Sequence, residues 1–175
     1  GNTLIKVAVY DGGKQQFFES FEKDNFQQQF LARVPLQGCT HAIIATVVAE
    51  AEERFSFLSS LVSHCVMMSA QTPVPFTNRY ATPHSLGIDR IALVAGAVSR
   101  FPHHNTLIID AGTCLTFDFV NKKNEYLGGA IAPGIAMRLK AMHHFTSQLP
   151  LIEEQDFDTE QFIGNSTQSC MLSGV

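Results

Sequence analysis

The stretch PHSLGIDRIALVAG, residues 83–96, places an acid and a base side by side in an otherwise apolar segment. The acid is Asp89 and the base is Arg90. Apolar residues recur at helical spacing around them, so we predict a helix over residues 87–101. Two explanations of the charges stay open. Both residues can lie on a solvated helix face, where Asp89 caps the N-terminus or interacts with the helix dipole, or they can carry out chemistry.

Length and composition limit the function classes. The 175 residues can form one large domain or two small ones with sizeable cores. The apolar share of 45% and the charged share of 16% are typical of an ordered globular protein. The net charge of −4 argues against nucleic acid as a partner, and no apolar run reaches the roughly 18 residues of a membrane span. The four cysteines are scattered without a CxxC pair, which favours reduced thiols and a cytoplasmic location.

Both ends of the sequence are abrupt. It opens on the turn motif GNT without an initiator methionine, and it closes on LSGV inside a helix-like pattern. We therefore expect a piece of a longer protein.

The order of predicted elements is that of an α/β protein. Strand patterns occupy residues 4–11, 15–21, 41–48, 65–70, 105–112, 113–121 and 126–134. Helical patterns occupy residues 22–32, 51–64, 135–149 and 167–175, in addition to the helix at 87–101. The DGG sequence between the first two strands predicts a hairpin.

A crude internal repeat organises these elements. The segments GNTLIKVAVYDGG (1–13) and DAGTCLTFDFVNKKNE (110–125) both run through glycine, a small hydroxyl residue, a strand, a turn and a strand. In each, backbone amides and a Thr hydroxyl at a tight turn can donate to phosphate oxygens, although either motif alone is equally consistent with an ordinary turn. The repeat predicts two similar lobes, residues 1–102 and 103–175, with the second incomplete at its C-terminus.

Five segments, in order, resemble the type III pantothenate kinases: GNTLIK, YATPHSLGIDR, DAGTCLTFD, GGAIAPG and IGNSTQSCMLSG. The resemblance covers nearly the whole chain. It implies a duplicated actin-like (ribonuclease H-like), two-lobed α/β kinase fold with mixed sheets, from the acetate and sugar kinase, Hsp70 and actin superfamily. It also implies ATP-dependent phosphorylation of the pantothenate hydroxyl to 4′-phosphopantothenate, the first step of coenzyme A synthesis. The implied cofactors are Mg²⁺ and a monovalent cation, K⁺ or NH₄⁺, and the implied assembly is a homodimer.

The resemblance also implies a role for each residue that matches a family motif. Asp89 in GIDR would be the general base, and Asp110 in DAGT would bind the monovalent cation. The implied pantothenate-binding residues are Tyr80, Gly87, Ile88, Asp89, Arg90 and Thr167, and the implied ATP-binding residues are Gly1, Asn2, Thr3, Lys6 and Thr113. These roles suit the reaction, because a primary alcohol needs a carboxylate to accept its proton and phosphoryl transfer needs charge neutralisation.

Simpler explanations stay open for several of these residues. Arg90 could form a surface ion pair, Tyr80 could pack a loop, and Asp110 could bond the amides of its own turn. The adjacent histidine pairs 103–104 and 143–144 lack metal-ligand spacing, so we expect them in solvent. The alternative functions are a non-catalytic regulatory homologue and a kinase of another small hydroxy substrate.

The sequence departs from the family pattern in three ways. The aspartate that precedes GNT by two positions in the family lies outside this sequence, as does the adenine-side segment that follows LSGV. Cys114 stands where alanine is common. We expect the GNT and DAGT turns to face each other across a cleft, each about ten ångströms from Asp89, a scale that near-attack geometry and a triphosphate set.

Overall fold

The computed structural model describes residues 4–47, 51–153 and 162–175 of the chain. The chain divides into two compact units, each of which is described on its own. The first unit holds residues 1–106 and 120–127, and the second holds residues 107–119 and 128–175. Helices combine with strands that pair in both the antiparallel and the parallel sense, so the predicted mixed α/β class is confirmed.

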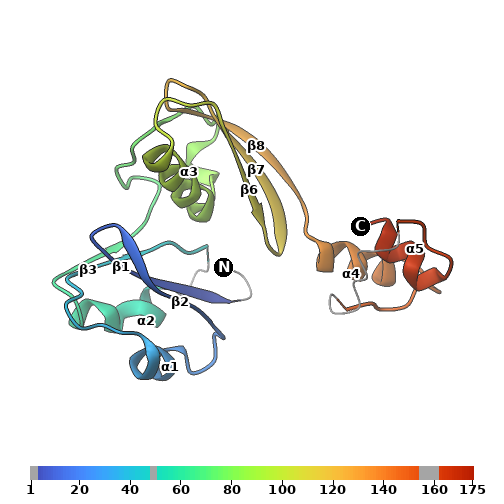
Figure 1. Ribbon diagram of the computed structural model, residues 1–175, viewed down its shortest axis with the longest axis horizontal. Helices are drawn as coiled ribbons and strands as arrows, with labels where there is room; N and C mark the ends of the chain where they lie inside the picture. Colours follow the sequence, from blue (N-terminus) through green and yellow to red (C-terminus); the bar gives the residue numbers. More distant parts are fainter. Residues whose placement is uncertain (1–3, 48–50, 154–161) are drawn as a thin grey trace. The chain divides into compact units, whose positions relative to one another are not determined.

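The first unit opens with the predicted hairpin. Strand β1 (Ile5–Asp11) pairs antiparallel with β2 (Lys14–Phe21), as Figure 1 shows. The loop residues Gly12 and Gly13 both have positive φ angles, 53° and 79°. Only glycine adopts such angles without steric cost, and a two-residue hairpin loop that matches the strand twist requires them.

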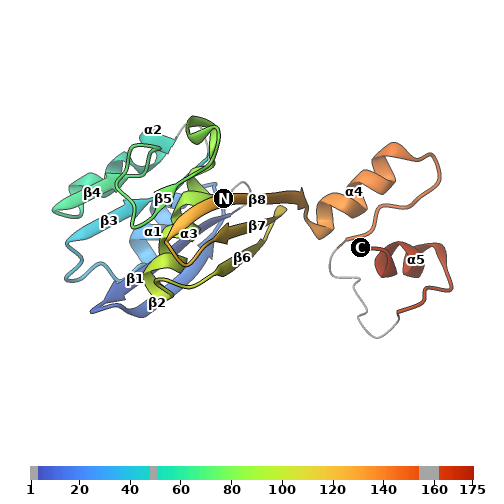
Figure 2. The same cartoon turned by 90° about the horizontal axis from the view of Figure 1, so that it is seen from above.

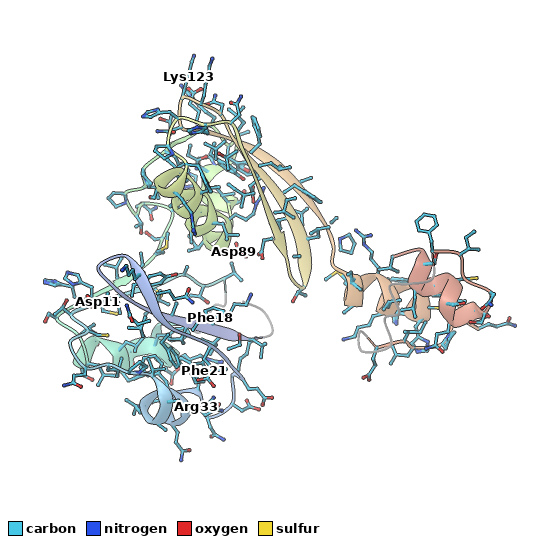
Figure 3. The ribbon with its side chains drawn as sticks, in the orientation of Figure 1. Asp11, Phe18, Phe21, Arg33, Asp89 and Lys123 are labelled. Carbon is cyan, nitrogen blue, oxygen red and sulfur yellow. The ribbon has the colours of Figure 1, made fainter. Side chains whose placement is uncertain are left out.

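An aromatic core lies against this hairpin. Helix α1 (Phe26–Arg33) contributes Phe26, whose ring centroid is 5.7 Å from that of Phe21, a residue only 1% exposed. The Arg33 guanidinium lies 4.6 Å from the Phe21 ring centroid (Figure 3). The helix begins at Phe26 rather than at residue 22, because the preceding Asn25 adopts a left-handed conformation with φ of 55°.

Two short strands of the first unit form a parallel pair. Strand β3 (His41–Ile44) runs parallel to β4 (His64–Met67), as Figure 2 shows. Between them lie helix α2 (Ala51–Phe55) and the 3₁₀ segment η1 (Ser56–Ser60), so the predicted helix over 51–64 is wrong in extent. The three serine hydroxyls of η1 donate to carbonyls three residues earlier and so compete with α-helical bonding.

Helix α3 (Ile88–Arg100) confirms the helix predicted around GIDR. Its buried residues are Arg90, Ile91, Val94 and Val98. Two short elements precede it that the sequence patterns did not reveal: β5 (Thr77–Asn78) and the 3₁₀ segment η2 (Pro83–Ser85).

A four-stranded sheet follows, in the order β5-β8-β7-β6. Its consecutive strands are β6 (Thr106–Ala111), β7 (Cys114–Val120) and β8 (Glu125–Pro133). Strand β5 joins the edge of the sheet by pairing parallel with β8, where Asn78 is opposite Tyr126. This pairing brings the loop before α3 beside the start of β8.

The second unit ends in two helices, α4 (Ile135–Phe145) and α5 (Thr167–Ser173). Leu139 of α4 and Met171 of α5 belong to one buried cluster. Helix α4 ends four residues before the predicted Leu149, because Thr146 is extended and its hydroxyl donates to the Met142 carbonyl at 2.7 Å. In the parts of the chain that the structure describes, no helix combines the length and apolar character that crossing a membrane requires.

Candidate active site

The N-terminus of α3 holds an aspartate with one anchored oxygen. Asp89 is exposed in the first turn, and its Oδ1 accepts a hydrogen bond from the Arg90 amide at 2.8 Å. The helix dipole stabilises the carboxylate there. Its other oxygen has no hydrogen-bond partner among the described residues. Asp89 is not the N-cap of α3, because that position is Gly87 and no side chain caps the helix. The carboxylate instead lies in the first turn, where it interacts with the helix dipole and keeps one oxygen available to accept a proton.

Gly87 leaves space for this carboxylate. It is the N-cap of α3, with an ordinary φ of −59°. A Cβ at this position would lie 2.5 Å from Oδ1 of Asp89, closer than such contacts occur. The glycine of GIDR is therefore explained by steric room beside Asp89.

Arg90 points into the first unit instead of into solvent. It is only 6% exposed, and its guanidinium carbon lies 5.7 Å from the ring centroid of Tyr80. A cation at that distance from a tyrosine ring is attracted by the electrons of the ring face. The explanation of Arg90 as a surface ion pair is therefore wrong.

Tyr80 stacks on a second tyrosine. The ring centroids of Tyr80 and Tyr126 are 6.0 Å apart and the ring planes differ by 18°, while Tyr126 is completely buried. Tyr80 itself is half-buried. The loop-packing explanation of Tyr80 thus holds for its contact with Tyr126, and part of the Tyr80 surface stays exposed. Sequence reasoning missed Tyr126, although this lone aromatic directly precedes the glycine-rich segment LGGAIAPG.

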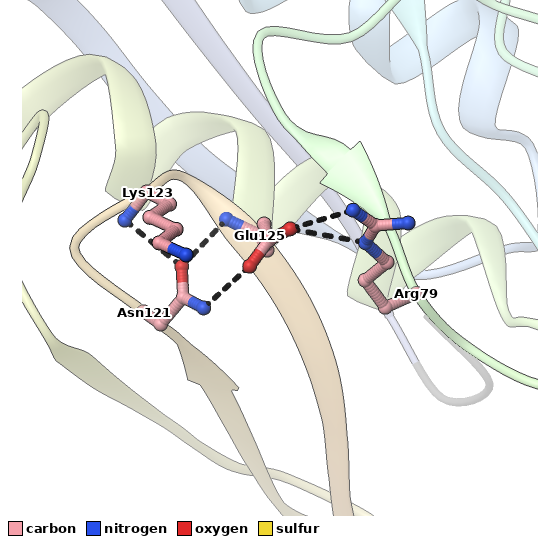
Figure 4. Close-up of polar contacts among 4 residues, drawn as sticks. All are labelled: Arg79, Asn121, Lys123 and Glu125. Atoms are coloured by element: carbon pink, nitrogen blue, oxygen red, sulfur yellow. Dashed lines mark hydrogen bonds and ion pairs between the residues drawn. The ribbon is translucent and has the colours of Figure 1, made fainter.

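An ion pair lies next to this stack in the chain. Arg79 donates from Nε and Nη2 to Oε1 of Glu125, at 3.1 and 2.7 Å (Figure 4). The Asn121 amide donates to Oε2 of Glu125 at 2.8 Å. The hydrogen bond from Asn121, followed by that from Arg79, lowers the pKa of Glu125 below its ordinary value of 4.5. The carboxylate is therefore charged at neutral pH and joins the loop before Tyr80 to the start of β8.

The DAGT turn lies between β6 and β7 in the second unit. The Gly134 amide, at the N-cap of α4, donates to the Thr113 carbonyl at 3.1 Å. A Cβ at Gly134 would collide with the carbonyl oxygens of Gly112 and Thr113. Only glycine fits this approach, so the last glycine of GGAIAPG lets the N-terminus of α4 lie directly against the turn.

The same turn carries the predicted cation ligand. Asp110 is half-buried at the end of β6, and its side chain makes no hydrogen bond or ion pair within the described residues. It therefore does not bond the amides of its own turn. A carboxylate supplies oxygen donors, which are the ligands that hard cations prefer. No group of three or more His, Cys, Asp or Glu side chains gathers to hold a metal ion in the described ranges.

Within each unit, the structure brings some of the predicted residues together. Tyr80 and the segment 87–90 lie together in the first unit, and Asp110 and Thr113 lie together in the second. Lys6 is exposed on β1, and Thr167 is exposed at the start of α5, after a capping box formed by Ser166 and Ser169. The predicted residues Gly1, Asn2 and Thr3 fall outside the described residues.

Comparisons with known proteins agree with these motifs. A family model described as type III pantothenate kinase matches residues 1–175. The type III pantothenate kinase of Christiangramia forsetii is 42% identical over the whole chain, which spans 71% of that protein. That of Flavobacterium psychrophilum is 43% identical, with 72% of its length spanned.

A solved structure shows a similar fold. It comes from Campylobacter jejuni and is described as a conserved Baf family transcriptional activator. The likeness has a TM-score of 0.58 at 20% identity and covers 97% of this chain and 69% of that one. The family match and the relatives, taken with the GIDR and DAGT motifs, establish that the chain belongs to the type III pantothenate kinase family.

Proposed function

We propose that this protein uses ATP to phosphorylate pantothenate, giving 4′-phosphopantothenate, the first step of coenzyme A synthesis. Its family and its relatives' names support this activity. The single observation that carries the proposal is the carboxylate of Asp89, which has one oxygen held by the Arg90 amide and the other free among the described residues.

Asp89 is the general base of this proposal. Its free oxygen accepts the proton of the pantothenate hydroxyl while the hydroxyl oxygen bonds to the terminal phosphorus of ATP and the bond from that phosphorus to ADP breaks. Anchoring through the helix N-terminus restricts the carboxylate to one orientation, which favours proton transfer along a defined direction. An exposed carboxylate at this position can meet a substrate from solvent.

Six residues that match the family motifs bind pantothenate. The binding set is Tyr80, Gly87, Ile88, Asp89, Arg90 and Thr167. Tyr80 closes over the substrate, and the buried guanidinium of Arg90 supplies positive charge for an anionic substrate from beside the Tyr80 ring. A charge held away from bulk water acts on a bound anion with less screening than an exposed lysine would.

The phosphate-binding residues come from both sequence repeats. Gly1, Asn2, Thr3 and Lys6 form the first phosphate loop and Thr113 contacts ATP from the DAGT turn. Asp110 holds the monovalent cation, K⁺ or NH₄⁺, for which its free carboxylate is suited. When bound, that cation and Mg²⁺ neutralise charge on the phosphates.

The finer architecture belongs to the same proposal. The two sequence repeats are the lobes of a duplicated actin-like fold, with a boundary near residue 102. The likeness to the Campylobacter jejuni structure supports a fold shared over most of the chain. The protein acts as a homodimer in the cytoplasm.

The direct test is a substrate panel. The full-length protein is assayed with ATP, Mg²⁺ and K⁺ against pantothenate and a set of small hydroxy acids and sugars. We expect turnover of pantothenate above every other compound. Faster turnover of another hydroxy compound would make the protein a different kinase, and ATP binding without turnover of any compound would favour the non-catalytic homologue.

A further inference from the structure

Tyr80 has a defined packing partner in the first unit. Its ring lies 6.0 Å from that of Tyr126, centroid to centroid, with the planes 18° apart. Tyr126 is completely buried, and on another side it meets Phe76 edge-on at 6.0 Å. A buried ring has few alternative positions, because packed interiors leave little free volume. Tyr126 is therefore a fixed surface against which the half-buried Tyr80 rests.

The backbone holds the two rings in this register. The parallel pairing of β5 with β8 places Asn78 opposite Tyr126, and the Arg79 amide donates to the Tyr126 carbonyl at 2.9 Å. The Asn78 side chain accepts a hydrogen bond from the Tyr80 amide, also at 2.9 Å. These bonds fix the path of the chain on both sides of Arg79. The backbone of Tyr80 is thus held in one position next to the ring of Tyr126.

An ion pair locks the same register through side chains. Arg79 directly precedes Tyr80, Glu125 directly precedes Tyr126, and the two charged side chains are 2.7 Å apart. Asn121 holds the other oxygen of Glu125 at 2.8 Å. In addition to the backbone hydrogen bonds, side chains join the loop that carries Tyr80 to β8 by charge and by aromatic stacking.

We infer that Tyr126 is a positioning residue for pantothenate binding, acting through the ring of Tyr80. This inference rests on the proposed function, in which Tyr80 closes over the substrate. Tyr126 is buried and does not touch the substrate. It holds the Tyr80 ring in the orientation that both the guanidinium of Arg90 and the substrate meet. Loss of its ring leaves Tyr80 free to turn, and the bound state must then order it again.

The test replaces the buried ring with an aliphatic side chain. In the full-length protein, Tyr126→Leu should raise the KM for pantothenate about twofold to tenfold, the range that an aromatic pair supports. The KM of Tyr126→Leu for ATP should stay within twofold of the parent value. Tyr126→Phe, which keeps the ring, should have the pantothenate KM of the parent. Phe21→Leu is the matched control, because Phe21 is also an almost fully buried ring and packs in a different cluster, around Phe26. It should leave the pantothenate KM unchanged although it also truncates a buried ring.

A double substitution separates positioning from general loss of packing. If Tyr126 acts through Tyr80, then Tyr126→Leu should not raise the pantothenate KM further once Tyr80→Ala is present. Unchanged pantothenate KM in Tyr126→Leu, or equal increases for pantothenate and ATP, would overturn the inference while leaving the kinase activity standing. A parent protein that does not phosphorylate pantothenate would overturn the proposed function, and the inference with it.

Discussion

Gly87 and Asp89 share one space at the start of α3: a Cβ on Gly87 would lie 2.5 Å from Oδ1 of Asp89. That same oxygen accepts a hydrogen bond from the Arg90 backbone amide at 2.8 Å. A glycine two residues before the acid is therefore a condition for the anchored carboxylate. The contact therefore explains why the motif GIDR contains this glycine. It does so from the protein's own atoms, without reference to a bound ligand.

Gly87→Ala should reduce activity without unfolding the protein. The added methyl group displaces a side-chain oxygen, not backbone, so the helix can stay while the carboxylate moves. We expect kcat to fall by up to about a hundredfold, the effect of misplacing a catalytic group by an ångström. Gly96→Ala in the same helix is the control, because its Cβ would meet no atom within 4 Å. It should raise the free energy of unfolding by about 0.5–1 kcal/mol and leave kcat unchanged. Equal kcat values for the two variants would contradict the steric argument.

Asp89→Asn should remove the group that accepts the proton of the substrate hydroxyl, while the N-terminus of α3 keeps its structure. The amide oxygen of asparagine can still accept the Arg90 backbone amide, while its NH₂ group donates where the free carboxylate oxygen accepted. We expect kcat to fall by roughly two to four orders of magnitude, the usual contribution of a positioned base. Pantothenate binding, measured by calorimetry, should be nearly unchanged. A variant with a kcat within a few-fold of the parent would remove Asp89 from the role.

Asp110→Ala should weaken the response to the monovalent cation. The carboxylate makes no hydrogen bond or ion pair within the described ranges, so its removal costs the turn little. We expect the parent to need K⁺ or NH₄⁺ and to fail in Na⁺ alone. The variant should show a raised KM for ATP that added K⁺ no longer lowers, at a thermal midpoint close to the parent's. Full activity of the parent in Na⁺ buffer would rule out the assignment.

Glu125 should make the stability of the protein depend on pH in the acid range. Hydrogen bonds from Asn121 and Arg79 lower its pKa in the folded state below the ordinary value of 4.5. Between 4.5 and that lowered pKa the unfolded chain binds more protons than the folded one, so stability falls as pH falls through this window. Above pH 4.5 the Glu125 carboxylate makes its full contribution to the free energy of unfolding.

Glu125→Gln removes this titrating group. In urea titrations, the parent should lose its stability advantage over Glu125→Gln as pH is lowered from 5 into the window below 4.5. Asn121→Ala and Arg79→Gln should each reduce the pH dependence, because the hydrogen bonds from both residues lower the pKa of Glu125. Parallel pH profiles for the parent and Glu125→Gln would show that the pair has no such effect.

Local signals in the sequence predicted part of this structure well. The DGG turn, the periodic pattern of α3 and the short turn at DAGT are set by neighbouring residues, and all three are present. The sequence motifs also identified Asp89 and Asp110 as candidates. Each lies at an element end where its neighbours leave a carboxylate oxygen without a partner among the described residues.

The features that the sequence did not reveal depend on contacts between distant segments. Strand β5 has only two residues, too few for a periodic pattern, and it exists because β8 supplies its hydrogen bonds. The guanidinium of Arg90 lies near Tyr80, and Tyr80 stacks on Tyr126, a residue 46 positions later in the chain. Helix α2 ends early because serine hydroxyls compete with backbone amides for the carbonyl groups. The spacing of the apolar residues does not indicate this effect.

Transfer of a phosphoryl group to the hydroxyl of pantothenate, with Asp89 as the base, is the reaction on which the activity predictions depend. The most direct measurement is identification of the product after incubation of the full-length protein with pantothenate, ATP, Mg²⁺ and K⁺. Mass spectrometry and phosphorus NMR should show one phosphate ester, at the 4′ hydroxyl, formed in step with ADP and suppressed in Asp89→Asn. Release of ADP and free phosphate without this ester, or equal ester formation by Asp89→Asn, would contradict the claim.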